Sequence, residues 1–296
     1  MKELVVISGK GGTGKTSIAA AFASLARNAV LADCDVDAAD LHIILEPKIR
    51  QASDFSGGKK ASIITEKCID CGKCADMCRF GAISLNGPSN GTIAKTYTVD
   101  PVSCEGCKVC VEFCPAEAIK FEDAINGQWF ISDTRFGPMV HAKLGIAEEN
   151  SGKLVTLIRK EAKRIADEQN KDLLIIDGSP GIGCPVIASI TGSDLVLVVT
   201  EPTLSGIHDL ERVSQLTSDF GIQTLVSVNK ADINPDMTER IEKYVEEKGL
   251  KVVGKIPYDE SFTKAQIMKA TLIEYTGSNI AEKVKSMFRE ITYVLG

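Results

Sequence analysis

The sequence of 296 residues has no run of about 18 apolar residues that could span a membrane, and it begins with an apolar strand-like segment instead of a charged and then apolar leader. Its net charge of -6 offers no attraction for nucleic acid, and aromatic residues make up only 5%, so few side chains could stack on bases. We therefore expect no nucleic-acid partner, no stable membrane insertion, and a soluble, cytoplasmic protein.

Histidine is also scarce, because only His42, His141 and His208 occur and none has the spacing of a metal ligand. Cysteine is the opposite case. Eight of the ten cysteines fall into two tight clusters, in a chain whose glycine loop is typical of intracellular nucleotide-binding proteins. Metal ligation therefore explains them better than the disulfides of a secreted protein. The length allows one large domain or two smaller ones.

The segment from Ser8 to Ser17, S-G-K-G-G-T-G-K-T-S, follows a short apolar run and precedes an Ala-rich stretch with helical spacing. In the pattern G-x-x-x-x-G-K-[ST], backbone N–H groups cradle phosphates, the lysine reaches the outer phosphates and the hydroxyl ligates magnesium. The residues that fill this pattern are Gly9, Gly14, Lys15 and Thr16. A strand, a glycine loop and a helix start therefore predict a nucleoside triphosphate site. The other loop residues expected at the nucleotide are Gly11, Gly12, Thr13 and Ser17.

The same loop also fits G-x-G-x-x-G through Gly9, Gly11 and Gly14, with Asp33 about 20 residues further on, as in a dinucleotide-binding unit. The pair Lys15-Thr16 favours the triphosphate, because a dinucleotide has no outer phosphate for a lysine and needs no magnesium ligand there. A dinucleotide-dependent oxidoreductase and a glycine-rich turn without a ligand are the alternatives.

Two cysteine runs share the spacing C-x2-C-x2-C-x3-C, and the second ends in Cys-Pro. This spacing is typical of bacterial ferredoxins with two clusters, in which the fourth cysteine of each run ligates the other cluster. One expected 4Fe–4S cluster has the ligands Cys68, Cys71, Cys74 and Cys114. The other has the ligands Cys104, Cys107, Cys110 and Cys78.

Zinc is the main alternative, since four thiolates suit it as well, although zinc sites rarely use three cysteines at two-residue gaps and a fourth after three more. Arg79 follows Cys78 where a proline would be usual, and a long link at 86–100 separates the runs. The turn residues and alternating pattern of this link predict a hairpin. Neither departure removes a ligand.

Lys10, directly after the first glycine, makes the loop more specific: G-K-G-G-T-G-K-T resembles the deviant Walker A loop of the MinD, ParA and nitrogenase iron-protein family. The resemblance implies an ATPase in which Lys10 crosses to the nucleotide of a partner, in a homodimer or a heterodimer with a related ATPase. A solvated loop lysine is the alternative. The family's first switch corresponds to D-C-D-V-D, so the resemblance implies that Asp35 orients the attacking water and that Asp33 supports magnesium through water. Helix-capping aspartates are the other interpretation of this acidic run.

A second acid, Asp177, ends an apolar run, which places a carboxylate beside magnesium. The following G-S-P-G-I-G resembles the family's second switch. Cys184 corresponds to a shared-cluster ligand of the nitrogenase iron protein, but no second such cysteine follows, so we expect a buried thiol at a helix start. By resemblance Asn229 recognises the purine and the Pro257 backbone reads adenine, whereas ordinary turn chemistry would also explain both.

Apolar runs alternate with helical stretches along the rest of the chain. This alternation predicts an α/β fold with a mostly parallel, doubly wound sheet, interrupted by a small α+β ferredoxin domain. We expect the ATPase domain at 1–60 and 124–296 and the ferredoxin domain at 61–123, with a polar, glycine-rich boundary at 51–60. The segment 134–153 is too polar for core and is a candidate for coupling the two modules, or else an ordinary surface excursion.

The leading functional hypothesis is an ATPase that uses ATP, Mg2+ and two 4Fe–4S clusters. Its nucleotide state would govern electron transfer to a redox partner, or delivery of clusters to a metalloprotein client, because the insertion follows the first switch directly. One alternative is an iron–sulfur scaffold or carrier that uses ATP only to release clusters. Another is a positioning ATPase of the ParA kind whose clusters sense redox state.

Overall fold

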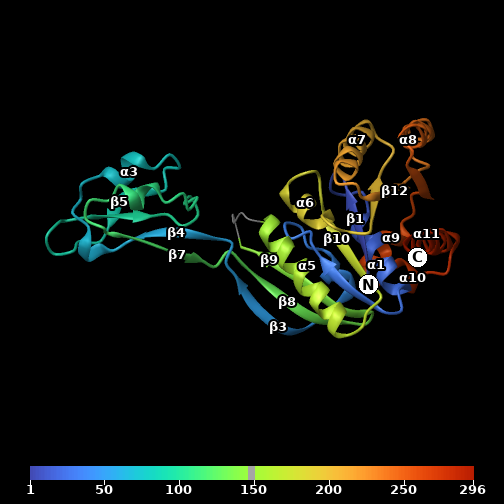
Figure 1. The fold of residues 1–296 in the computed structure, drawn as a ribbon, viewed down its shortest axis with the longest axis horizontal. Helices are drawn as coiled ribbons and strands as arrows, with labels where there is room; N and C mark the ends of the chain where they lie inside the picture. The colour runs from blue at the N-terminus through green and yellow to red at the C-terminus, as the bar shows by residue number, and fades with distance from the viewer. Residues whose placement is uncertain (146–150) are drawn as a thin grey trace. The chain divides into compact units, whose positions relative to one another are not determined.

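The computed structural model describes residues 1–145 and 151–296, which form two compact units (Figure 1). The large unit consists of residues 1–53, 129–143 and 151–296. The cysteine-rich unit consists of residues 54–128 and the short stretch that begins at Leu144. Each unit has its own hydrophobic core.

The large unit is built on a nine-stranded sheet. In sheet order its strands are β13 (Lys251–Ile256), β12 (Gln223–Asn229), β11 (Leu195–Thr200), β1 (Lys2–Ser8), β10 (Leu173–Pro180), β2 (Ala29–Asp33), β9 (Gly137–Leu144), β8 (Gly127–Thr134) and β3 (Lys48–Phe55). Each neighbouring pair from β13 to β9 is parallel. This confirms the predicted mostly parallel α/β sheet.

The register of the central strands brings two predicted acids together. Val6 of β1 pairs with Asp177 of β10, and Asp177 in turn pairs with Asp33 of β2. Because the strands are parallel, both carboxylates lie at the carboxyl ends of the strands, on the side of the sheet where β1 ends in Ser8 and the glycine loop begins. Ligands bind at these strand ends in open α/β sheets.

Helices cover both faces of the sheet. Leu4 and Val6 of β1 pack into a core with α1 and α11, whereas Val5 and Ile7 are equally buried toward the opposite face, as the alternation of a strand requires. Helices α5, α6 and α7 contact the central strands β10, β1 and β11. The helices of this unit are α1 (Lys15–Leu25), α2 (Leu41–Leu45), α5 (Ser151–Glu168), α6 (Cys184–Ile190), α7 (Leu204–Asp219), α8 (Pro235–Glu247), α9 (Ser261–Ile267), α10 (Leu272–Tyr275) and α11 (Asn279–Leu295).

The cysteine-rich unit has two small antiparallel sheets, β4 (Gly58–Ile63) with β7 (Ile119–Ala124) and β5 (Ile83–Gly87) with β6 (Thr96–Val99). The second pair confirms the hairpin predicted in the link between the cysteine runs. Three short helical segments complete the unit, η1 (Thr65–Lys67), α3 (Lys73–Met77) and α4 (Val109–Glu112). Its core contains cysteines among its apolar residues, with Cys74 and Cys110 buried beside Ala61, Ile83 and Ile119.

The predicted boundary stretch 51–60 contributes to the end of β3 and the start of β4; β3 is an edge strand with mostly exposed side chains, so polar residues suit it. The expectation that the segment 134–153 is too polar for core is wrong, because it contains β9, whose residues Met139 to Ala142 are buried between β2 and β8. The part of that segment at 146–150 lies outside the described residues.

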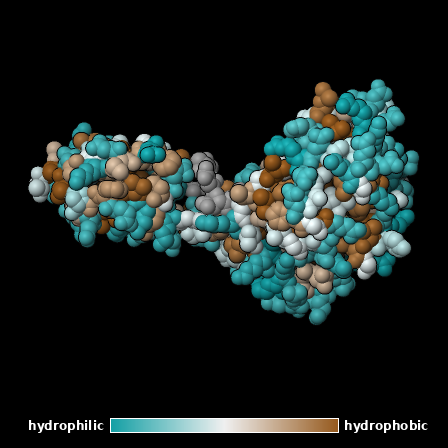
Figure 2. Space-filling model, turned by 45° about the horizontal axis from the view of Figure 1, so that its top comes forward, coloured by the Kyte–Doolittle hydropathy of each residue, from teal (hydrophilic) through white to brown (hydrophobic). Residues whose placement is uncertain are grey.

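Within residues 1–145 and 151–296, no helix is both long and apolar enough to cross a membrane. On the face drawn in Figure 2, apolar residues form patches among hydrophilic ones.

Candidate nucleotide and cysteine sites

The glycine loop joins β1 to α1 and needs glycine at two points. Gly14 caps α1 with φ 87°, in the left-handed region, and a Cβ there would lie 2.4 Å from Asn229 Nδ2. A Cβ on Gly9 would lie 2.2 Å from the Cβ of Asp209 in α7. The loop therefore packs tightly against two neighbouring elements, and its backbone N–H groups remain at the N-terminus of α1, where anions bind.

A cavity of about 400 Å³ opens over this loop, a volume within the usual range for small-molecule sites. Most of the residues predicted to bind nucleotide line it. They are Gly11, Gly12, Thr13, Gly14, Lys15, Thr16, Ser17, Asp35, Asn229 and Pro257. Gly9, Lys10, Asp33 and Asp177 do not line it.

Lys15 connects the loop to two of the predicted acids. Its Nζ lies 2.6 Å from Asp177 Oδ1 and 3.3 Å from Asp35 Oδ2, and all three side chains are buried. Burial alone would lower the pKa of Lys15, but the charges of Asp177 and Asp35 outweigh it and raise that pKa. The lysine is therefore held as a cation inside the site.

Three carboxyl groups, those of Asp33, Asp35 and Asp177, act on the single ammonium group of Lys15. Burial and the charge of Asp177 raise the pKa of Asp33 well above its usual range, and burial also raises that of Asp35. One oxygen of Asp33, Oδ2, and one of Asp177, also Oδ2, are buried without a hydrogen-bond partner. Unpaired carboxylate oxygens beside a phosphate loop and the Thr16 hydroxyl are the donor set that Mg2+ prefers. The residues present therefore fit a magnesium ion.

Asn229, at the end of β12, forms a hydrogen bond with the glycine loop. Its Nδ2 donates to the Thr13 carbonyl oxygen at 2.8 Å, and its Oδ1 accepts from the Lys230 backbone N–H at 3.0 Å. Pro257 follows β13 and lines the cavity with Tyr258, whose N–H donates to Asp232 Oδ1 at 2.6 Å. The two predicted base-recognition residues are thus brought to the same cavity as the phosphate loop.

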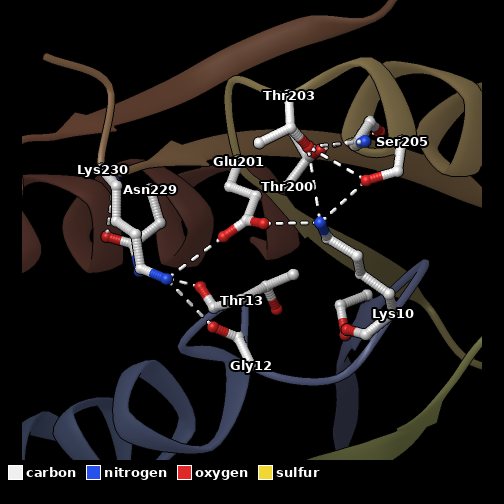
Figure 3. Close-up of polar contacts among 11 residues, drawn as sticks. Lys10, Gly12, Thr13, Thr200, Glu201, Thr203, Ser205, Asn229 and Lys230 are labelled. Atoms are coloured by element: carbon white, nitrogen blue, oxygen red, sulfur yellow. Dashed lines mark hydrogen bonds and ion pairs between the residues drawn. The ribbon is translucent and has the colours of Figure 1, made fainter. Parts of the chain in front are cut away.

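Lys10 does not line this cavity and is bound within its own chain (Figure 3). Its Nζ lies 2.6 Å from Glu201 Oε1 and donates to Ser205 Oγ at 2.9 Å. Lys230 reaches the other oxygen of the same carboxylate, at 3.1 Å from Oε2, and donates to the Gly12 carbonyl oxygen at 3.2 Å. Glu201 therefore bridges Lys10 of the glycine loop and Lys230, which follows β12.

Sequence reasoning missed one wall of the cavity and one acid beside the glycine loop. The wall belongs to α9, where Phe262, Thr263 and Gln266 line the cavity and Gln266 Nε2 donates to Ser17 Oγ at 2.8 Å. The acid is Glu201, which follows β11 and does not line the cavity. The end of β11 at the ligand-binding edge of the sheet was a usable signal for Glu201, whereas nothing in the sequence of α9 marks it as a cavity wall.

The eight clustered cysteines gather in two cavities of the cysteine-rich unit. One is lined by Cys68, Cys71, Cys74 and Cys114. The other is lined by Cys78, Cys104, Cys107 and Cys110. Each cavity thus receives three cysteines of one run and the fourth of the other, the exchange that the spacing predicts for a pair of clusters.

The members of each set lie at different depths. Cys74 and Cys110 are buried, whereas Cys71 and Cys107 are exposed. The Ala118 N–H donates to Cys114 Sγ at 3.3 Å, and burial raises the pKa of Cys74 to about 11. Four thiols around one cavity are a donor set for a metal centre, either an iron–sulfur cluster or zinc.

The two remaining cysteines differ from each other. Cys34 is buried directly after β2, and burial raises the pKa of its thiol, which suits a structural residue. Cys184 is the first residue of α6, as predicted, but it is exposed, so the expected buried thiol is wrong. Its helix starts at the surface of the unit, where the first turn leaves the side chain uncovered.

A glycine loop between the first strand and first helix, with acids at the ends of adjacent parallel strands, defines a P-loop nucleotide-binding protein of the α/β class. The chain belongs to the CobQ/CobB/MinD/ParA nucleotide-binding family, whose domain matches residues 4–272. The predicted resemblance to the MinD and ParA proteins is therefore confirmed.

One relative matches nearly the whole chain, and another matches only a short segment of it. An uncharacterized protein of Methanocaldococcus jannaschii is 30% identical over 295 residues, 98% of this chain and 96% of the relative. An uncharacterized ferredoxin of the same organism is 43% identical over 54 residues, 18% of this chain and 66% of that protein. The chain is thus a member of the MinD/ParA family with a ferredoxin-type insertion.

A solved structure shows the same fold. The septum site-determining protein MinD of Pyrococcus horikoshii, complexed with Mg-ADP, has a TM-score of 0.58 over 100% of this chain and 97% of its own, at 16% identity.

Proposed function

We propose that this chain is a magnesium-dependent ATPase whose nucleotide state controls two 4Fe–4S clusters. The observation that carries the proposal is the buried group at the end of the glycine loop, where Lys15 lies between Asp35 and Asp177 and two carboxylate oxygens have no partner. Such a group is costly to bury unless a ligand completes it. The MinD structure bound to Mg-ADP supports the identity of that ligand.

Different residues of the loop would bind the phosphate oxygens and the magnesium ion. The backbone N–H groups from Gly11 to Ser17 would bind the phosphate oxygens, and Lys15 would exchange its contacts with the acids for the outer phosphates. Thr16, Asp33 and Asp177 would hold magnesium, which when bound neutralises charge that develops on the phosphates. Thr16 and Lys15 line the cavity, Lys15 Nζ lies 2.6 Å from Asp177 Oδ1, and Asp177 pairs with Asp33 in the sheet, which supports this assignment.

Two further residues would act on the bond that is cleaved. Asp35 lines the cavity and would orient the attacking water. Lys10 does not line its own cavity, so we assign it to the nucleotide of a second subunit, in a homodimer or in a heterodimer with a related ATPase.

The base would lie at the ends of β12 and β13. Asn229 keeps a second hydrogen on Nδ2 for a purine nitrogen, although its other contacts serve the loop. Pro257 lines the same cavity, and its carbonyl would accept from the adenine amino group. Tyr258 adds an aromatic side chain at the rim.

The cysteine-rich unit would hold one cluster on each set of four thiols and would exchange electrons with a redox partner or deliver clusters to a metalloprotein client. The ferredoxin relative and the two cysteine-lined cavities support this assignment. Cluster binding deprotonates thiols that are otherwise held neutral by burial, as for Cys74 and Cys110.

The test is anaerobic ATP turnover by cluster-replete protein, measured with oxidised and with dithionite-reduced clusters, while electron paramagnetic resonance records the clusters with and without ATP. We expect turnover to change with cluster oxidation state and the spectra to change on ATP binding. Labile transfer of clusters to an apo-protein during turnover would instead favour the carrier function. Absence of both responses, with normal turnover, would contradict coupling while leaving the ATPase assignment intact.

A further inference from the structure

Lys10 has a complete set of acceptors inside its own chain. The three acceptors around its Nζ are Glu201 Oε1 at 2.6 Å, Ser205 Oγ at 2.9 Å and Thr203 Oγ1 at 3.4 Å (Figure 3). An ammonium group has three hydrogens to donate, so all of them are satisfied here. Lys10 is therefore bound at a defined place and is not a loosely solvated loop residue.

Glu201 is the only negative charge among those three acceptors, and it serves a second lysine. Lys230 lies 3.1 Å from Glu201 Oε2 and also donates to the Gly12 carbonyl oxygen. The Glu201 side chain is only 15% exposed, and burial opposes its ionisation, but the hydrogen bonds from Lys10 and Lys230 outweigh burial and lower its pKa. One carboxylate thus holds two ammonium groups beside the glycine loop.

Apart from Glu201, the groups that accept from Lys10 Nζ are neutral hydroxyls at the start of a helix. Thr203 caps α7, accepting from the Gly206 N–H at 2.9 Å, and Ser205 belongs to the first turn of that helix. The N-terminus of a helix carries partial positive charge and repels a lysine. Lys230 adds a full positive charge nearby. Without the carboxylate, Lys10 would have two neutral hydroxyls and two sources of repulsion.

We propose that Glu201 is a positioning residue that holds Lys10 in its own subunit until a nucleotide-bound partner replaces the carboxylate. The inference rests on the proposed function, in which Lys10 acts on the nucleotide of that partner. Lys10 cannot satisfy Glu201 and a partner's phosphates at once, so the contact with Glu201 raises the protein concentration needed for pairing. Lys230 keeps Glu201 and Gly12 occupied when Lys10 leaves, so the loop retains its contacts.

The test measures ATP turnover of the full, cluster-replete chain against protein concentration. Glu201→Gln keeps the shape and a neutral acceptor but removes the charge. We expect the half-maximal protein concentration to fall by about 5- to 10-fold, a modest effect because the pair is partly exposed and Gln still accepts a hydrogen bond. The maximal rate and the affinity of dilute protein for a non-hydrolysable ATP analogue should stay within about twofold, which separates positioning from damage to the loop.

Three further variants make the result decisive. Glu290→Gln removes a Lys251–Glu290 ion pair of the same 2.6 Å length at a distant surface position and should change nothing. Lys230→Ala leaves Glu201 to Lys10 alone and should not lower the half-maximal concentration. If it lowers that concentration as Glu201→Gln does, the effect passes through Lys230 and the proposal is overturned.

Lys10→Ala separates this proposal from the one on which it rests. Loss of turnover in Lys10→Ala, together with an unchanged concentration dependence in Glu201→Gln, would overturn the positioning role of Glu201 alone. Full turnover in Lys10→Ala would overturn the assigned role of Lys10 and the holding contact with it. The expected outcome is an inactive Lys10→Ala, in the presence or absence of Glu201→Gln, and a shifted concentration dependence in the single Glu201 variant.

Discussion

The sharing of cysteines between the two runs can be tested by replacing them in pairs. The structure places Cys71 and Cys114 in one cavity and Cys78 in the other. A chain with two 4Fe–4S clusters holds about eight iron atoms. Cys71→Ala with Cys114→Ala removes two ligands of one cluster, so about four iron atoms should remain. Cys71→Ala with Cys78→Ala removes one ligand from each cluster, so the iron content should fall toward zero.

The assay is iron and acid-labile sulfide per chain in protein purified without oxygen, together with electron paramagnetic resonance after reduction. Cys184→Ala is the matched control, because this exposed thiol lies in the other unit and outside both cavities. It should keep about eight iron atoms. The reasoning would be refuted if the pair Cys71 and Cys114 lost nearly all iron while the pair Cys71 and Cys78 kept half, since each run would then hold its own cluster. Equal loss in both pairs would also contradict it.

Three further predictions concern the large unit. Asp33→Asn should raise the free energy of unfolding of ligand-free protein by about 0.5–2 kcal/mol, because it relieves repulsion from Asp177. The same variant should weaken magnesium-dependent nucleotide binding in calorimetry. A lower free energy of unfolding would contradict this reasoning. Phe22→Ala should cost about 3–5 kcal/mol in urea unfolding, since Phe22 is fully buried and its ring lies 5.1 Å from that of Phe288. Burial and nearby His42 lower the pKa of His141 to about 4, so the unfolded state, with a pKa of about 6.5, binds the proton first and stability is lost as pH falls from about 6.5 to about 4. His141→Gln should therefore remove about 1–2 kcal/mol of the stability difference between pH 7 and pH 5, and an unchanged difference would rule out this origin.

The parts of the site that the sequence predicted are those set by local pattern and by the parallel sheet. The glycine loop is contiguous, and Asp33 and Asp177 each end a strand, so parallel pairing was enough to bring them together. The cysteine exchange was predictable because the spacing is that of ferredoxins with two clusters, in which the fourth cysteine of each run ligates the other cluster.

The strands that sequence reasoning missed derive their structure from their neighbours. β9 has only four consecutive buried positions, between a Gly-Pro start and a lysine, and it is stable because β2 and β8 flank it. β3 has almost no apolar residue facing a core, since it lies at the sheet edge. In both strands the hydrogen-bond pairing, which the sequence does not display, decides the conformation.

The resting positions of long side chains were also beyond the sequence. The family resemblance indicates where Lys10 acts, but its resting contact depends on Glu201 and Ser205, about 190 residues away in the chain. Cys184 shows the same limit, because its position at a helix start was predictable and its exposure was not.

Both lysines of the glycine loop form ion pairs with carboxylates, but they differ in how deeply they are buried. Lys15 lies against Asp177 and Asp35 with its side chain only 6% exposed, whereas Lys10 lies against Glu201 and its side chain is 32% exposed. Both must leave carboxylates to reach phosphates, and a buried pair is far harder to break than a partly exposed one unless another charge replaces the departing partner. Lys15 should therefore move only when a nucleotide with outer phosphates enters its own cavity. Lys10 can be released by a weaker event, the approach of a second loaded subunit, so nucleotide binding would precede pairing.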